Sequence, residues 1–175
     1  QCSGPTPVCD TGPGTCRACT LDSECASGAC NLESGACIAE ASVLYAAPTG
    51  TPNTMCTRAM PCTVKQALSI VNTAKSTVVL ADGDYTVNAG TEALLAGAKS
   101  ALVVGAPAAK FVAAVAQTSA IRVTTKAAAT LRGFSFYRSG VTCNDAVVRI
   151  RNLKFDLGGT SSTNCQTTVV ASLFV

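Results

Sequence analysis

Apolar and polar positions recur in a fixed order through the C-terminal part of the chain. The segments 131–136, 150–155 and 170–175 each begin with an apolar residue, continue with small or polar residues and end with apolar ones. Their first residues, Leu131, Ile150 and Val170, lie 19 and then 20 residues apart. A repeat of this length with strand-like alternation predicts a β-solenoid, in which each copy forms one coil.

Side chains on a strand alternate between the two faces of a sheet, so the repeat also predicts which side chains form the core. Gly133 and Asn152 tolerate a left-handed bend and would mark a corner of the coil. Arg132, Ser135 and Phe174 would point outward. The inward side chains would stack in three columns: Leu131, Ile150 and Val170; Phe134, Leu153 and Leu173; Phe136, Phe155 and Val175.

The segment that leads into the repeats has its own order of elements. Thr63 and Gln66 form a capping box, in which each side chain can bond the backbone of the other residue at the start of a helix. The expected elements are a strand over 43–46, a turn bracketed by Cys56 and Cys62, an amphipathic helix over 64–73, a strand over 77–81 and a turn over 82–84.

This order resembles the start of right-handed parallel β-helix proteins of the pectate-lyase-like class. The residues that carry the resemblance are P-C-T-x-x-Q-A-L over 61–68 and V-V-L-A-D-G-D-Y-T over 78–86. The resemblance implies an all-β domain, a right-handed parallel β-helix, which we expect over 41–175. The strand segments of this sequence predict about four coils. In that class a short helix closes the N-terminal mouth. The fold carries lyases, hydrolases, adhesins and inert fibres, so it leaves the function open.

The N-terminal part contains a second, shorter duplication. The segment 9–16 matches 30–37 at a shift of 21 residues, and each copy is a turn-rich stretch between two cysteines. The second copy is complete in Cys19, Cys25, Cys30 and Cys37, which allow three pairings. The first copy has only Cys2, Cys9 and Cys16. We expect a small disulfide-stabilised module over 1–40.

The stretch 19–30 resembles the short Cys-rich repeats of secreted proteins from myxobacteria and their relatives. That resemblance implies a surface or stalk module. The alternative is a zinc site, because Cys16 and Cys19 form a C-x-x-C pair. The chain contains no His, and dense cysteines of a secreted protein normally form disulfides, so we expect no metal.

The cysteines also indicate where the protein works. Eleven cysteines in 175 residues are typical of an oxidising, extracellular setting, so we expect a secreted or cell-surface protein. Cys56 and Cys62 should pair locally, and Cys143 and Cys165 lie about one coil apart and can bridge neighbouring coils. Buried free thiols are the alternative for the second pair. The odd total leaves one thiol for a bond between subunits if all the others pair.

The remaining composition excludes several kinds of partner and chemistry. A net charge of +3 predicts no nucleic-acid binding, and the apolar stretch 101–116 is too short and too interrupted to span a membrane. Without His, and with only scattered carboxylates in the solenoid, the chain favours a non-enzymatic role without a cofactor. Asp82 and Asp84 fit a turn, with a calcium site as the alternative. The other solenoid carboxylates considered are Glu92, Asp145 and Asp156.

A basic stripe is the candidate binding surface. Arg132 would lie over Arg151, with Arg149 and Lys154 nearby. Stacked like charges repel, so the column either binds an acidic polysaccharide or is simply a solvated basic face, which we favour.

The leading hypothesis is a secreted, non-enzymatic structural or adhesive solenoid, for example a fibre subunit. It would associate head to tail through an uncapped last coil formed by Leu173, Phe174 and Val175, and through a disulfide. The alternative is the N-terminal part of a pectate-lyase-like, carbohydrate-active enzyme. A third hypothesis is a display module whose solenoid holds the Cys-rich part away from a cell.

Overall fold

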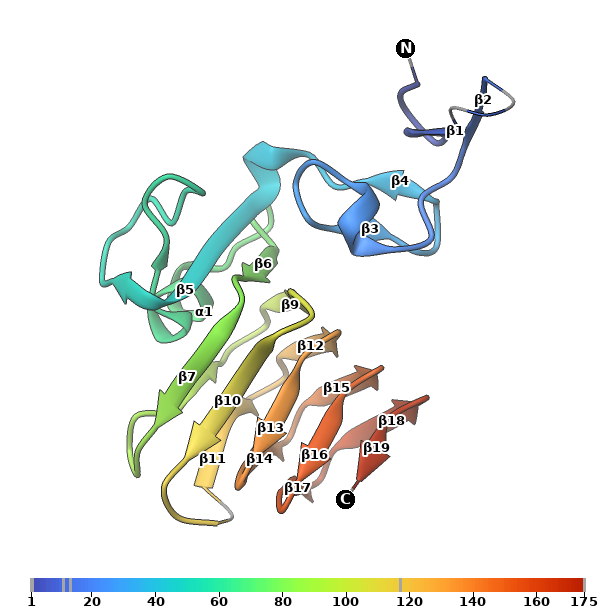
Figure 1. Ribbon diagram of the computed structural model, residues 1–175. Coiled ribbons are helices and arrows are strands. Elements are labelled where there is room, and N and C mark those ends of the chain that lie inside the picture. The colour runs from blue at the N-terminus through green and yellow to red at the C-terminus, as the bar shows by residue number, and fades with distance from the viewer. Residues whose placement is uncertain (1, 11, 13, 117, 175) are drawn as a thin grey trace. The chain divides into compact units, whose positions relative to one another are not determined.

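The computed structural model describes residues 2–10, 12, 14–116 and 118–174, and the chain divides into two compact units. Unit 1 is Gln1–Val43 and unit 2 is Leu44–Val175. Strands predominate in both, and unit 2 consists mainly of stacked parallel sheets (Figure 1). Among the described residues, no helix has the length and apolar character needed to cross a membrane.

Unit 1 consists of two small antiparallel hairpins and two single turns of 3₁₀ helix. In the hairpins Cys9 is opposite Cys16 and Cys30 is opposite Cys37, so the duplication seen in the sequence is also a duplication of structure. The elements are β1 (Val8–Asp10), β2 (Thr15–Arg17), η1 (Asp22–Glu24), β3 (Cys30–Asn31), β4 (Ala36–Cys37) and η2 (Glu40–Ser42).

The described residues of unit 2 form three sheets. The first, in spatial order, is β18 (Gln166–Val170), β15 (Val147–Arg151), β12 (Ala128–Arg132), β9 (Ser100–Gly105), β6 (Thr77–Leu80) and β5 (Val43–Thr51). The second is β19 (Leu173–Phe174), β16 (Lys154–Asp156), β13 (Ser135–Tyr137), β10 (Ala109–Ala113) and β7 (Gly83–Val87). The third is β17 (Gly159–Thr163), β14 (Ser139–Asn144), β11 (Thr118–Thr124) and β8 (Ala93–Leu95).

The chain visits the three sheets in a constant order. It runs through β6, β7 and β8, then β9, β10 and β11, and continues in the same way to β18 and β19 (Figure 1). Within the described residues, the strands from β6 to β19 pair in parallel. This arrangement confirms the prediction of an all-β unit of stacked parallel sheets and is consistent with a β-solenoid.

Left-handed residues at the corners set the length of the later coils. Gly133 and Asn152 have φ of 81° and 53°, as predicted for the bend, and Ala171 has φ of 49°. These three residues lie 19 positions apart. A second corner repeats at Arg138 and Leu157, and a third at Lys126, Asp145 and Asn164, each again at a spacing of 19. The backbone period is therefore 19 throughout this part.

The side-chain register follows the same period and corrects the predicted columns. Ile150 pairs with Val169 and not Val170, and Phe155 pairs with Phe174. The prediction that Phe174 points outward is therefore wrong, because the last copy of the repeat begins at Val169 and not at Val170. Val175, predicted in the inward column, lies outside the described residues. The inward aromatic column is Tyr85, Phe111, Phe136, Phe155 and Phe174.

The helix α1 (Val64–Ile70) begins where the capping box predicts and ends three residues before Thr73. The Thr63 hydroxyl accepts a hydrogen bond from the backbone N–H of Gln66 at 3.1 Å. At the other end, the Asn72 side chain accepts from the backbone N–H groups of Ala74 and Lys75, which favours a turn over another helical turn. The buried face of the helix is Val64, Ala67 and Leu68.

Candidate functional site

The last coil of unit 2 is the feature with the clearest capacity for an interaction. The strands β17, β18 and β19 lie at the end of their three sheets, and within the described part of the chain no further strand pairs with them. In Figure 1 these strands are the red ones beside the C-terminus. Each presents an edge of backbone N–H and C=O groups, which is a template for another strand.

Apolar side chains are open at this end. Phe174 is 50 % exposed, although Phe155 beneath it in the same column is fully buried. The two rings are stacked with their centroids 4.7 Å apart. Val169 is 43 % exposed over buried Ile150. Leu173 is also exposed but belongs to the outer face, beside Lys154.

The other inward positions of this coil carry hydroxyl groups. Thr160, Ser162 and Thr167 stand over buried Val141, Cys143 and Val148. Ser172 follows the same change, and its Oγ accepts a hydrogen bond from the backbone N–H of Leu153 at 3.2 Å. Hydroxyl groups tolerate water and can also hydrogen-bond across a contact. This end therefore combines inward-facing hydroxyl groups with a small apolar patch at Val169 and Phe174.

A disulfide ties the last coil to the previous one. Cys143 and Cys165 are bonded, with their Cα atoms 6.1 Å apart, as their spacing of about one coil predicts. Cys56 and Cys62 also form the local disulfide that the sequence predicts. The Cys143–Cys165 bond limits how far β17 and β18 can separate from the stack, so the end of the solenoid is held in register.

At the opposite end of unit 2, two of the three sheets have a further element beside their first strand, whereas β7 is the edge strand of its sheet. The strand β5 lies outside β6 in the six-stranded sheet, and α1 packs against β8. The Tyr85 hydroxyl is a hydrogen-bond donor to backbone carbonyl oxygens, and it lies 3.0 Å from that of Ala46 and 2.9 Å from that of Ala81. Burial raises the pKa of this phenol above its usual range, so it remains a neutral donor.

The predicted basic stripe is divided between two sheets. Arg132 and Arg151 are in register on β12 and β15, and Arg149 is exposed on β15. Arg132 itself is only 6 % exposed. Lys154 belongs to β16 in another sheet, in register with Ser135. The four residues therefore do not form one column.

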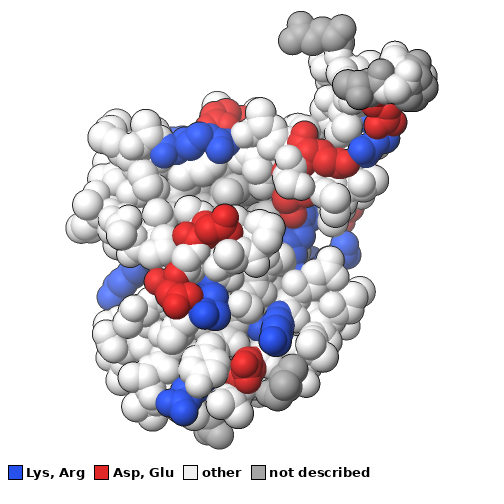
Figure 2. All heavy atoms as spheres, viewed as in Figure 1, with Lys and Arg blue, Asp and Glu red and all other residues white. Residues whose placement is uncertain are grey.

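Lys154 lines a groove of about 440 Å³ on the outer face of β10, β13 and β16. Opposite charges alternate along it, and Lys110 forms an ion pair with Asp84 at 3.2 Å. Figure 2 shows basic and acidic residues interspersed on the face that it draws. A surface of mixed sign has little preference for a polyanion. The lining residues are Asp84, Lys110, Val112, Ser135, Phe136, Tyr137, Lys154 and Asp156.

Three of the solenoid carboxylates, Asp82, Asp84 and Glu92, have structural partners. Asp82 accepts a hydrogen bond from the backbone N–H of Ala108 at 2.8 Å, and Glu92 pairs with Arg122 at 2.7 Å. Within the described residues, the groups of three or more potential metal ligands are two cysteine clusters, both involved in disulfides. Asp82 and Asp84 belong to neither cluster.

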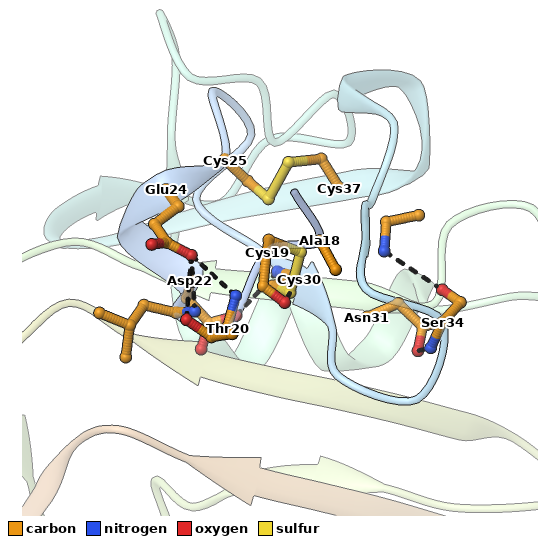
Figure 3. The surroundings of a disulfide bond; sticks show 12 residues. Ala18, Cys19, Thr20, Asp22, Glu24, Cys25, Cys30, Asn31, Ser34 and Cys37 are labelled. Atoms are coloured by element: carbon orange, nitrogen blue, oxygen red, sulfur yellow. Dashed lines mark hydrogen bonds between the residues drawn. A yellow bond between two sulfur atoms is a disulfide. The ribbon is translucent and has the colours of Figure 1, made fainter. Parts of the chain in front are cut away.

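The second Cys-rich repeat is fully cross-linked. Cys19 bonds Cys30, and Cys25 bonds Cys37, which resolves the three pairings that the sequence allows (Figure 3). Beside them, the Glu24 carboxylate accepts hydrogen bonds from the Arg17 guanidinium and from the backbone N–H groups of Thr20 and Leu21. These donors lower the pKa of Glu24 from 4.5 to about 2.

The first repeat has three sulfur atoms in one place. The Sγ atoms of Cys2, Cys9 and Cys16 lie within 4.8 Å of one another, and Cys2 is within bonding reach of both of the others. A sulfur atom forms one disulfide, so one of the three remains available.

Comparisons of the chain with protein-family models, with curated proteins and with solved structures found no match.

The residues that matter at the last coil were partly missed in the sequence, because small hydroxyl residues give no hydrophobic signal. The 19-residue spacing of Gly133, Asn152 and Ala171 was the signal that could have placed them.

Proposed function

We propose that the protein is a secreted, non-enzymatic structural solenoid that associates with a second copy through the free edges of β17, β18 and β19. Unit 2 is then a right-handed parallel β-helix with four complete coils from β6 to β17, and α1 closes its N-terminal mouth. Unit 1 is a disulfide-stabilised surface module. Disulfides in both units support an extracellular setting.

The observation that carries this proposal is the half-exposed ring of Phe174 at the end of a column whose other Phe rings are buried. Three strand edges lie around it. A partner must match all three edges and cover Val169 and Phe174 together. A second copy of the same end has edges with the same spacing. A contact around a twofold axis uses the same surface patch on both copies, so this patch must be complementary to itself.

The two ends of unit 2 differ, and this difference favours one orientation. Head-to-tail association, which the sequence suggested, needs a second end with three free sheet edges. At the N-terminal end β5 lies beside β6 and α1 packs against β8, so that among the described residues only β7 has a strand edge without a neighbouring element of this kind. Two C-terminal ends that meet around a twofold axis close the contact, with facing strands antiparallel, and no further copy can add. We therefore infer a dimer and not a filament. The inward-facing hydroxyl groups of the last coil make the association weak, with a dissociation constant in about the micromolar range.

Hydrogen–deuterium exchange resolves the surface directly. At high protein concentration the backbone amides of β17, β18 and β19 should gain protection relative to a dilute sample. The variant Phe174→Lys should remove that gain, and Val115→Lys, at an exposed apolar residue away from the edge, should preserve it. Equal exchange of these amides at all concentrations would overturn the proposal.

The competing account assigns the same edge to further coils of a longer protein, as in a pectate-lyase-like enzyme. Limited proteolysis and mass measurement of the protein from its natural source separate the two. Additional residues that protect β17, β18 and β19 would contradict dimerisation through this edge, and a lyase assay on acidic polysaccharides would then follow.

A further inference from the structure

We propose that Cys9 forms its disulfide with a cysteine outside residues 1–175, and that Cys2 and Cys16 bond each other. The inference does not depend on the association of solenoid ends. Eleven is an odd number, so the eleven cysteines cannot all pair within the chain. The structure pairs eight of them unambiguously: Cys19, Cys25, Cys30, Cys37, Cys56, Cys62, Cys143 and Cys165. The three that remain are Cys2, Cys9 and Cys16.

The two repeats of unit 1 can be matched residue by residue at their hairpins. Cys9 and Cys16 are opposite each other in the first hairpin, as Cys30 and Cys37 are in the second. The backbone N–H of Gly14 donates to the carbonyl of Asp10 at 2.9 Å, and that of Gly35 donates to Asn31 at 2.7 Å. Cys9 therefore corresponds to Cys30, and Cys16 corresponds to Cys37.

The position of Cys2 follows from the turn after it. Cys2 precedes Ser3 and Gly4, and Cys25 precedes Ser27 and Gly28 after one additional residue. Gly4 and Gly28 both have positive φ, at 63° and 72°. Cys2 thus corresponds to Cys25. Because Cys25 bonds Cys37, the corresponding bond in the first repeat is Cys2–Cys16, for which the structure also provides the contact.

Cys9 is left with the role of Cys30, whose partner is Cys19. With Cys2 and Cys16 bonded to each other and the other eight cysteines paired, no cysteine of residues 1–175 is left to take the place of Cys19 beside Cys9. Cys30 is fully buried, whereas Cys9 is exposed and open to a thiol from elsewhere.

The chemistry is a disulfide exchange with a small or protein disulfide as oxidant. The Cys9 thiolate attacks that disulfide and releases one thiolate of the oxidant, which takes up a proton. The thiolate of the partner cysteine then attacks the Cys9 sulfur and releases the second. Two cysteine thiols are oxidised to one disulfide, and the oxidant is reduced to two thiols. The partner is a cysteine of a preceding segment or of a second chain.

Disulfide mapping tests the assignment. The 175-residue chain is folded with oxidised glutathione, treated with N-ethylmaleimide without reduction, and cleaved before Asp10 and after Arg17. We expect fragment 1–9 bonded to fragment 10–17 through Cys2 and Cys16, with glutathione or maleimide on Cys9. A closed fragment 1–9 with label on Cys16, or label on Cys2, would overturn the assignment.

Two variants and the natural protein complete the test. Cys9→Ser should lose the adduct and keep the unfolding midpoint of unit 1, whereas Cys30→Ser should lower that midpoint because it breaks the buried bond to Cys19. In protein from the natural source, Cys9 should be bonded to an upstream peptide or, in a covalent dimer, to another chain. A free Cys9 thiol in that protein would contradict the proposal.

Discussion

The ring of Phe174 lies on the ring of Phe155 with an interplanar angle of 3° and a centroid distance of 4.7 Å. Phe155 stacks in the same way on Phe136, with centroids 4.9 Å apart. The spacing is that of neighbouring strands, so each coil adds one ring to a continuous column. The column is fully buried at Phe136 and Phe155 and half-exposed at Phe174, which makes the last ring the apolar centre of an open end.

Close stacking of the last coils depends on a glycine. A Cβ atom on Gly140 would overlap the carbonyl oxygen of Gly159 in the next coil, whereas a Cβ on Gly159 would meet no atom within 4 Å. Gly140→Ala should therefore destabilise unit 2 by about 1–3 kcal/mol, and Gly159→Ala by less than about 0.5 kcal/mol. Denaturant unfolding of both variants measures the difference, and equal stabilities would contradict the described register.

The Cys143–Cys165 disulfide should stabilise mainly the end of the solenoid. Replacing both residues with Ser should cost about 3 kcal/mol, because a closed loop of 22 residues is released in the unfolded chain. Amides of β17 and β18 should lose protection from hydrogen exchange before those of β9 and β12. The double Ser variant at Cys56 and Cys62 is the control, and it should leave β17 and β18 unchanged.

The pKa of Glu24 makes unit 1 sensitive to acid. Because the pKa falls from 4.5 to about 2 on folding, the charged carboxylate contributes stability that is complete above pH 4.5 and lost as the pH falls toward 2. Glu24→Gln should flatten the stability of unit 1 over this range, and Glu33→Gln should not. An NMR titration that places the Glu24 carboxyl near 4.5 would contradict the described hydrogen bonds.

The corner at Ala171 should be strained. Ala171 has φ of 49°, in the position that Gly133 and Asn152 occupy in the preceding coils. Ala171→Gly should therefore stabilise unit 2 by about 0.5–1 kcal/mol, since Gly adopts this conformation without steric cost. Ala114→Gly, outside a left-handed corner, should give no gain. Thermal unfolding of the two variants measures the effect, and a loss of stability in Ala171→Gly would refute the assigned corner.

The sequence was sufficient for the coarse fold because its signals are local and repeated. Alternation around Phe134 and Phe136 indicates a strand, Gly133 and Asn152 indicate a bend, and Thr63 and Gln66 indicate a helix start. The structure contains stacked parallel sheets, these corners and that helix. Each signal depends on a few neighbouring residues, so one sequence contains all of it.

The register of the last coil was not predictable from hydrophobicity. Both Val169 and Val170 are apolar, and both Phe174 and Val175 are too, so two alignments fit equally well. The backbone selects one because Ala171 adopts the left-handed corner, and no residue-type preference marks Ala for that conformation. The register also determines the candidate surface, since Phe174 belongs to the inner column and not to the outer face.

The disulfide arrangement of unit 1 also required the structure. Four cysteines allow three pairings, and spacing alone does not choose among them. The hairpin registers and the bonds Cys19–Cys30 and Cys25–Cys37 make the choice in the second repeat and provide the template for the first.

Sedimentation equilibrium of the Cys9→Ser chain over a wide concentration range measures the association of solenoid ends by itself, because this variant removes any covalent link through Cys9. We expect the mass to increase reversibly from 17.6 kDa to twice that value, with no larger species. The same measurement on a chain that also contains Phe174→Lys should show only the monomer. A Cys9→Ser chain that remains monomeric at several hundred micromolar, or grows beyond the dimer, would contradict association through the C-terminal coil.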